Sequence, residues 1–245
     1  MKKLTFRNCR PLLWAGCLVA GVVLLAACNK NDDNNTPVQA AHLMAFNMVP
    51  DKAAGINITL SGNSITNLPL SYTSYTGYYL NIYTGQRQVQ SYDAANNTQL
   101  TSSSFTFNDS SYYSLFVVGA NNTYKNVIVR DDFDSLATTG QAYVRYVNAI
   151  PDSSQPLVTV AIGGSNVINL PSGYAHVSGF VAANAGPAVI TVSNGGTISA
   201  TRTITLEQNK VYTVLLTGVP GGTGDQAVQI KYIENGTLTA ENGGA

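Results

Sequence analysis

The residue types that most often carry catalysis are scarce in this chain of 245 residues, and their spacing matches no known catalytic motif. The two histidines, His42 and His176, do not form a zinc-binding spacing. The sequence has no nucleophile elbow for a serine and no Gly-Lys-Ser/Thr loop for a phosphate. The glutamates are only Glu207, Glu234 and Glu241, so a glycosidase carboxylate pair could only come from aspartates in turns. We therefore expect a protein that is not an enzyme.

One residue has a clear chemical use, the cysteine at position 28. The chain starts with Met1-Lys2-Lys3, and the apolar run 12–27 follows, which predicts a secretory signal peptide too short to be a good spanning helix. The run ends in Leu25-Ala26-Ala27-Cys28, which resembles the bacterial lipobox. In that family of signals the cysteine thiol receives a diacylglyceryl group and becomes the new N-terminus. We interpret residues 1–27 as a lipoprotein signal peptide; an ordinary signal peptide that contains a cysteine is the alternative.

Removal of this signal changes the composition of the chain. Cys9 and Cys17 leave with it, so Cys28 has no partner for a disulfide or a thiolate metal site. Four basic residues also leave, and nine basic residues remain against 13 acidic ones, a formal charge of −4. An acidic chain without a Lys/Arg cluster is a poor nucleic-acid binder. We expect an exported outer-membrane lipoprotein that is held to the membrane by lipid and does not bind nucleic acid.

Residues 28–39 are expected to form a lipidated flexible tether, because the segment 29–37 is polar and has almost no apolar side chain to bury. Lys30, Asp32 and Asp33 also resemble the surface-export signal of Bacteroidetes lipoproteins. If that resemblance is meaningful, the protein faces the outside of the cell. A solvated spacer without any address is the alternative.

The rest of the chain contains two copies of one sequence pattern. Residues 46–51 reappear as 147–152, both with the form Asn-x-x-Pro-Asp, and Asn67-Leu68-Pro69 reappears as Asn169-Leu170-Pro171. We assign the first copy to residues 40–130, an acidic linker to 131–140, the second copy to 141–234 and a flexible tail to 235–245. The repeated proline and aspartate predict a shared corner of the fold, because proline ends a strand and aspartate accepts backbone N–H groups in turns.

Within each copy the apolar residues alternate with polar ones, as in Ile56, Ile58 and Leu60. Turn residues such as Gly163-Gly164 separate these runs every 8 to 12 residues or so. The pattern predicts about seven short strands per copy and no sustained helix after residue 28. We therefore expect an all-β protein with two tandem immunoglobulin-like antiparallel β-sandwich domains.

The second copy contains the segments 144–152 (VRYVNAIPD) and 206–214 (LEQNKVYTV). With these segments it resembles the bacterial domain-of-unknown-function 4397 family. The first copy departs from it, with Met44-Ala45 where the second copy has Arg145-Tyr146. The family occurs in exported proteins, often in tandem, so the resemblance implies the fold and the export but no defined activity.

The linker between the copies contains the acidic residues Asp131, Asp132 and Asp134. Several carboxylates on one short segment could hold Ca²⁺ and stiffen the pair of domains, since calcium takes many oxygen ligands. The alternative is a solvated linker, because charged residues normally occupy loops. Asp134-Ser135-Leu136 also resembles the Bacteroidetes O-glycosylation motif, which makes Ser135 a candidate attachment site.

Tyrosines form the most suggestive cluster. All 14 lie after the signal peptide, whereas the single tryptophan, Trp14, lies within it. Five of them gather in the first copy: Tyr72, Tyr75, Tyr78, Tyr79 and Tyr83. An exposed tyrosine offers a flat apolar face and a hydroxyl, which suits a sugar ring or a partner protein. The alternative is that tyrosine is simply a favoured residue of half-buried strands.

These observations favour a non-enzymatic envelope lipoprotein that acts as a surface binding or adhesion module for a glycan or a protein. The alternative is a periplasm-facing structural or assembly subunit that binds other envelope proteins. We expect no cofactor other than the covalent lipid on Cys28 and, if the linker binds it, calcium.

Overall fold

The structure, a computed structural model, describes residues 38–239, and from Gln39 onward the chain forms one compact unit. The predicted signal peptide, the lipidation site Cys28 and most of the tether lie outside the described residues. No helix in the described part of the chain is long and apolar enough to cross a membrane.

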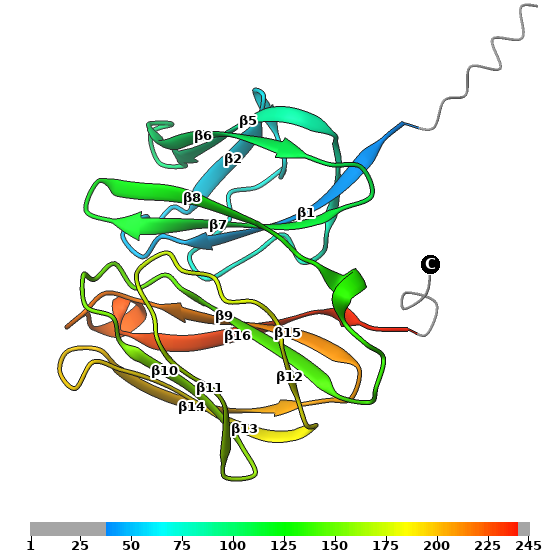
Figure 1. The fold of residues 1–245 in the computed structure, drawn as a ribbon. Helices are drawn as coiled ribbons and strands as arrows, with labels where there is room; N and C mark the ends of the chain where they lie inside the picture. The colour runs from blue at the N-terminus through cyan, green and yellow to red at the C-terminus, as the bar shows by residue number, and fades with distance from the viewer. Residues whose placement is uncertain (1–37, 240–245) are drawn as a thin grey trace, which may run out of the picture. The chain divides into compact units, whose positions relative to one another are not determined.

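The first copy contains eight strands in two sheets. One sheet has the order β4-β1-β7-β8 and the other β3-β2-β5-β6. Figure 1 shows these strands in blue to green. Their bounds are β1 Ala40–Met48, β2 Ile56–Leu60, β3 Asn63–Ser64, β4 Leu80–Tyr83, β5 Gly85–Asp93, β6 Gln99–Phe107, β7 Tyr112–Ala120 and β8 Thr123–Arg130.

The second copy repeats this arrangement strand for strand. Its sheets have the orders β12-β9-β15-β16 and β11-β10-β13-β14. The bounds are β9 Ala142–Asn148, β10 Leu157–Ile162, β11 Ser165–Pro171, β12 Val181–Ala183, β13 Gly186–Ser193, β14 Ser199–Leu206, β15 Lys210–Thr217 and β16 Gln229–Thr237. Two short 3₁₀ helices, η1 (Phe133–Ser135) and η2 (Gly224–Gln226), lie in loops. The expected pair of β-sandwiches is confirmed.

Each copy also has one feature that the periodicity did not indicate. The first strand lies parallel to the seventh, as β1 with β7 and β9 with β15, whereas the other pairs within each sheet are antiparallel. A parallel pair places the start of both strands at the same end of the sheet. The chain therefore enters each sandwich at the end where its seventh strand begins.

Alternation along the strands builds a separate core inside each sandwich. Leu43, Ile58 and Leu115 belong to the first core, and Val144, Ile190 and Val214 belong to the second. These side chains lie on every second position of their strands, as the period-two pattern predicts. The opposite face of the outer sheets is exposed to solvent, as the burial of β13 shows.

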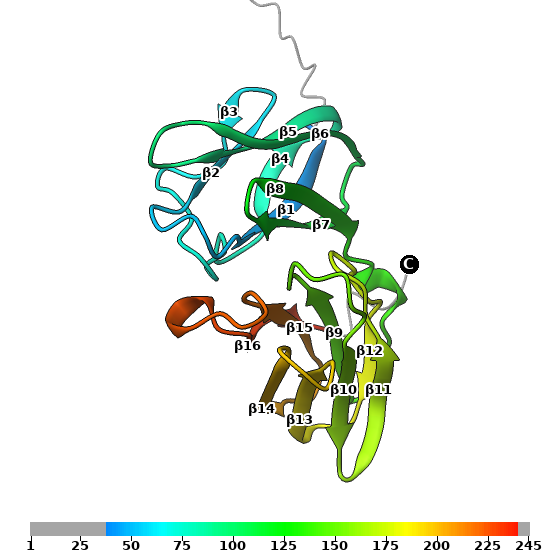
Figure 2. The same ribbon diagram turned by 90° about the vertical axis from the view of Figure 1, so that its left-hand side faces the viewer.

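A third apolar layer joins the two sandwiches. β9 is buried at every position, and β1, β7 and β15 are buried at nearly every position, because each has one face on its own core and the other on this layer. Figures 1 and 2 show the sheet of β1 and β7 next to the sheet of β9 and β15. Strands buried on both faces read as almost continuous apolar runs in the sequence. The buried residues of the layer are Met44, Phe46, Met48, Phe116, Val118, Val147, Ala149, Leu215 and Ile233.

The end of the second copy differs from the expected boundary at residue 234. β16 continues to Thr237, which pairs with Lys210 at the start of β15. Asn235, which was assigned to a flexible tail, is 9% exposed and bonded inside the protein. The ladder to β15 and these side-chain bonds explain why the strand extends this far.

The Asn-x-x-Pro-Asp elements form equivalent corners. The side-chain amide of Asn47 donates to the Leu70 carbonyl (2.8 Å), and that of Asn148 donates to the Ser172 carbonyl (2.9 Å). Both asparagines are buried. Buried amides are retained where they satisfy backbone groups, so the element has a structural role in both copies.

Tyr72 and Tyr174 occupy equivalent positions in the two copies, but their hydroxyl groups differ in hydrogen bonding. The Tyr72 hydroxyl lies 2.8 Å from Thr217 Oγ1 in the other copy. The Tyr174 hydroxyl, at the matching position of the second copy, is buried without a hydrogen-bond partner among the described residues. Burial raises the pKa of Tyr174 to about 12. Val118 is the repeat equivalent of Thr217, so the first copy lacks the hydroxyl that Tyr174 would need.

We predict that Tyr72→Phe and Tyr174→Phe differ in their effect on stability. Tyr72→Phe should lower the free energy of unfolding by about 1 kcal/mol, because it leaves the Thr217 hydroxyl without its partner. Tyr174→Phe should leave stability unchanged or raise it, because it removes an unpaired buried hydroxyl. Urea unfolding of both variants measures this. Equal losses in the two variants would contradict the described bonding.

Candidate functional site

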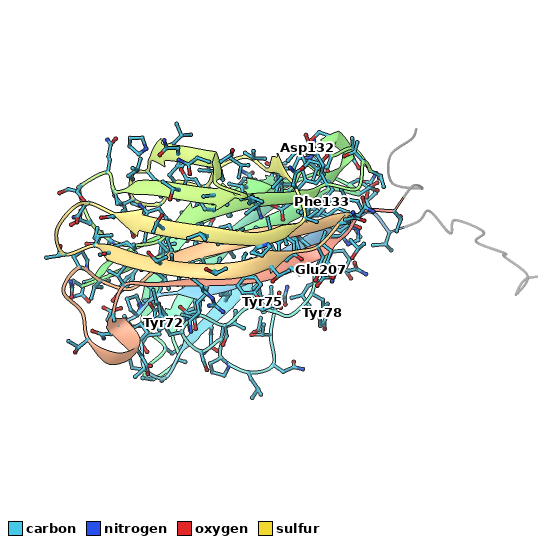
Figure 3. The ribbon with its side chains drawn as sticks, turned by 90° about the horizontal axis from the view of Figure 1, so that it is seen from below. Tyr72, Tyr75, Tyr78, Asp132, Phe133 and Glu207 are labelled. Atoms are coloured by element: carbon cyan, nitrogen blue, oxygen red, sulfur yellow. The ribbon has the colours of Figure 1, made fainter. Side chains whose placement is uncertain are left out.

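The five tyrosines of the predicted binding surface do not lie on one face. Tyr75 and Tyr79 pack against the layer between the sandwiches, and Tyr72 bonds across it. Tyr78 and Tyr83 are 66% and 69% exposed. Figure 3 shows Tyr72, Tyr75 and Tyr78 at successive places along the strand direction. The expectation of a common tyrosine surface is therefore corrected: three of these rings hold the copies together, because the layer needs large side chains to fill it.

Tyr79 is the most constrained of these residues. Its hydroxyl donates to Asp131 Oδ2 (2.6 Å) and accepts from the Asn235 side-chain amide (3.1 Å). Burial, with the Asp131 carboxylate as the second cause, raises the pKa of Tyr79 far above its ordinary value. The hydroxyl therefore stays protonated and works as a donor inside the protein.

Asp131 and Arg145 form a buried ion pair at this place. Arg145 Nη1 donates to Asp131 Oδ1 at 2.6 Å, and the side chains are 2% and 0% exposed. Two further arginine donors reach one hydroxyl in each sandwich: Nη2 to Ser114 Oγ (2.8 Å) and Nε to Thr213 Oγ1 (3.0 Å). Ser114 and Thr213 occupy equivalent repeat positions on β7 and β15.

The remaining polar atoms close this network. Ser114 Oγ donates to Asp131 Oδ2 (2.7 Å), and Thr213 Oγ1 donates to Asn235 Oδ1 (2.6 Å). The Phe180 ring lies against the guanidinium, 4.4 Å from Arg145 Cζ. A buried charge is tolerated only when it is paired and hydrogen-bonded. The network meets that condition with residues from both copies and from the segment between them.

The predicted calcium site is not formed as expected. The Asp131 carboxylate points into the interface and is bonded to Arg145, Ser114 and Tyr79, so it is not available to a metal in the linker. Asp132 is exposed, and Asp134 lies 3.9 Å from Arg130. In the described part of the chain no group of three His, Cys, Asp or Glu residues is placed to hold a metal ion.

Ser135, the candidate O-glycosylation site, is exposed on η1. Its hydroxyl donates to the Asp132 carbonyl at 2.9 Å, and the following Leu136 is buried. The hydroxyl is therefore reachable from solvent, and its modification stays a prediction.

The neighbourhood of the ion pair also contains a row of aromatic rings, which we call the aromatic strip: Tyr83, His42, Tyr112 and Phe133. His42 and Tyr112 are neighbours on β1 and β7, and their rings stack with centroids 4.5 Å apart and planes 21° apart. Tyr112 contacts Phe133 at 5.4 Å and Tyr79 at 5.1 Å. Tyr83 on β4 lies opposite Ala40, one diagonal step from His42.

The aromatic strip lies on the same face of the first sandwich as the apolar layer. His42, Met44 and Phe46 share one face of β1, because side chains two positions apart point the same way. At Met44 and Phe46 this face is buried by the second copy, whereas at the strip Tyr112 is 37% and Tyr83 is 69% exposed. The aromatic strip is thus a partly uncovered continuation of the interface, backed by the partly buried Tyr79.

Sequence reasoning found Tyr83 but missed His42, Tyr112 and Phe133. These residues lie in three separate segments, and strand pairing and the turn of η1 bring them together. The parallel pairing of β1 with β7 was the missing information, because it sets His42 beside Tyr112. His176, the second histidine, is exposed and 5.9 Å from Tyr146.

Comparison with known proteins places both copies in one family. The model of the family described as "Domain of unknown function (DUF4397)" matches residues 41–155 and 142–245. No curated protein matches the chain. A solved structure, the crystal structure of CBMbc (family CBM26) from Eubacterium rectale Amy13K in complex with maltoheptaose, is 9% identical, and the match covers 84% of this chain and 100% of that one. Its TM-score of 0.24 is too low for an argument about fold or ligand.

We predict that removing one partner of the buried ion pair strongly lowers the free energy of unfolding, whereas replacing both partners lowers it much less. Asp131→Ala should lower the free energy of unfolding by about 3 to 5 kcal/mol, because it leaves the Arg145 charge buried and unpaired. Asp131→Leu combined with Arg145→Met should cost much less, since Met44 already fills the equivalent position of the first copy. Chemical unfolding tests this, with exposed Asp132→Ala as the control. A double variant as unstable as Asp131→Ala would contradict it.

A second expectation concerns calcium. Because Asp131 is committed to Arg145, millimolar Ca²⁺ should leave the melting temperature unchanged. Differential scanning calorimetry with and without a chelator measures this. A calcium-dependent rise that disappears in Asp132→Ala would restore the original linker hypothesis.

Proposed function

We propose that this chain, which belongs to the family described as Domain of unknown function (DUF4397), is a non-enzymatic cell-envelope lipoprotein. Its two sandwiches act together as one binding module at the membrane surface. The observation that carries the proposal is the aromatic strip, an exposed recognition surface set on a rigid base. Binding residues on a preorganised base lose little entropy when they take a ligand.

The rigidity of this base supports a binding role. The strip stands on β1, β4 and β7, and Phe133 is fixed between Tyr112 and Tyr79. The ion pair and the apolar layer below hold the second sandwich against the same sheet. The rings are therefore held in place by both copies.

The chemistry-bearing side chains near the strip support a role without catalysis. His42 is stacked on Tyr112, and the nearest buried acid, Asp131, is neutralised by Arg145. A general base needs a free position within hydrogen-bond reach of a substrate proton. The arrangement offers ring faces and exposed polar groups, which recognise a ligand by contact.

The membrane attachment in this proposal rests on the sequence. Cys28 precedes the first strand residue, Ala40, by 12 positions. An extended chain spans at most about 3.6 Å per residue, so a lipidated Cys28 would hold the module within roughly 45 Å of the bilayer. Ala40 lies opposite Tyr83, so the tether joins the module beside the aromatic strip.

A structural or assembly role is the second candidate, and one repeated feature favours it. Leu68 and Leu170, from the Asn-Leu-Pro element of each copy, are 77% and 59% exposed. A leucine exposed at the same place in both copies suits contact with another protein. Under this alternative the module would stay in the periplasm and bind envelope proteins at two equivalent places.

We predict that Cys28→Ser releases the protein from the membrane fraction. The unchanged protein should carry a mass increase equal to its acyl chains, and the variant should appear in the soluble envelope fraction, because the lipid is its anchor. Fractionation with intact-mass spectrometry measures both. A Cys28→Ser variant that stays in the membrane would contradict the lipoprotein assignment.

Surface exposure is tested separately by adding protease to intact cells, with lysed cells and antibody staining as controls. We expect antibody staining of intact cells. Replacement of Lys30, Asp32 and Asp33 by alanine should abolish this staining if these residues act as the export signal. Staining that appears only after lysis would favour the periplasmic alternative.

The intact-mass spectra also test the candidate glycosylation site. An added glycan mass that disappears in Ser135→Ala would identify Ser135 as the attachment site.

A further inference from the structure

We propose that the aromatic strip binds a neutral sugar chain, with the ring of Tyr83 as its most exposed stacking surface. This rests on the proposed role as a binding module and names the class of ligand. Four features carry it: the geometry of the rings, the polar groups beside them, the charge of this end of the molecule, and the exposure of Tyr83.

The rings form a contiguous aromatic row. His42 and Tyr112 stack on each other, Tyr112 continues to Phe133, and Phe133 continues to Phe180 at 5.8 Å. Tyr83 stands beside this row on the edge strand β4. A sugar ring has an apolar face of C–H groups that packs on an aromatic face, and Tyr83 is the ring of the strip that is most exposed for such a contact.

Polar side chains border the aromatic strip, where sugar hydroxyls would need partners. Asn81 is exposed and lies opposite His42 on β4. Asp132 is exposed beside Phe133, and Figure 3 labels both residues near the end of the strands. An amide both donates and accepts, and a carboxylate accepts. Together with the Tyr83 and Tyr112 hydroxyls they match a ligand with many hydroxyl groups.

Charge narrows the choice of ligand. The basic residues beside the strip and at the nearby turns are Arg87, whose Cζ lies 5.9 Å from the Tyr83 ring centroid, and Arg130 and Lys210, which are both bridged to acids. The acidic residues at this end are Asp109, Asp132, Asp134, Glu207 and Glu234. A surface with excess negative charge repels polyanionic glycans and anionic lipid headgroups. A neutral chain has neither penalty.

Tyr83 is the most exposed ring of the strip: it is 69% exposed, against 37% for Tyr112. The second sandwich reaches this row at Phe133, through Phe180 at 5.8 Å, whereas Tyr83 lies on the edge strand β4.

The test uses the processed lipoprotein in a detergent without a sugar headgroup, which cannot compete for the site. The probes are hexasaccharides of neutral mannan, xylan, cellulose and chitin type, with an alginate hexasaccharide as the anionic counterpart. Isothermal titration gives the affinities. We expect at least one neutral probe to bind and the anionic probe to bind more weakly or not at all.

Three variants assign the binding to the strip. Tyr83→Ala should weaken binding of the neutral probe about fivefold or more, whereas Tyr83→Phe should keep most of the affinity because it keeps the ring. Tyr78→Ala is the matched control, since Tyr78 is equally exposed but outside the strip, and it should have no effect. In Tyr83→Trp the new indole is the only tryptophan of the processed chain, so its emission should shift when a sugar covers it.

Two results would overturn the inference. One is that no neutral probe binds, or that a neutral probe binds equally well to Tyr83→Ala. The other is that the emission of Tyr83→Trp shifts with phosphatidylethanolamine vesicles or with a co-purified protein and not with the sugars. The second result would leave a binding module on this strip with another ligand. The lipoprotein assignment is tested separately by fractionation of Cys28→Ser, a measurement that does not depend on any sugar.

Discussion

The buried pair of Asp131 and Arg145 sets the constraint on which the rest of this structure depends. Both charges are removed from water, so each must keep its partner and its hydrogen bonds. The bonds come from Ser114 in one sandwich, Thr213 in the other, and Tyr79 from the loop before β4. The apolar layer packs the two sheets together, and the ion pair fixes one relative position of the two sheets within it. The two copies therefore form a single body, and the aromatic strip is positioned by both.

The two copies have the same topology but different interface residues. Where β1 has Met44, β9 has Arg145, and where β15 has Thr217, β7 has Val118. At each of these positions one copy has a polar side chain and the other copy has an apolar one. The Tyr72 hydroxyl therefore has Thr217 as its partner, whereas the Tyr174 hydroxyl has no partner among the described residues. Two identical copies would bury either two arginines or none at the centre of the interface. The sequence differences thus specify a pair that fits in one arrangement.

The sequence predicts much of the fold and little of the candidate site. Alternation in Ile56, Ile58 and Leu60 and the repeated Asn-x-x-Pro-Asp corners are local signals, and they indicate the sandwiches correctly. The parallel pairing of β1 with β7 is a long-range contact without a local pattern, and it is what brings His42 to Tyr112. The acidic run after Arg130 looked like a solvated or calcium-binding linker, because nothing near Asp131 in sequence shows that Arg145 will face it. The tyrosine cluster contains both interface rings such as Tyr79 and exposed rings such as Tyr83, because the neighbouring sequence does not show which of them will face the second copy.

The two sandwiches should open and unfold as one body, and native-state hydrogen exchange tests this directly. Amides in the middle strands β1, β7, β9 and β15 are buried and bonded in both copies. Cooperative units reveal themselves by exchanging with a common free energy of opening. We expect the slowest amides of both copies to share one opening free energy and to respond alike to urea. Two separate values, with one copy exchanging while the other stays protected, would contradict it.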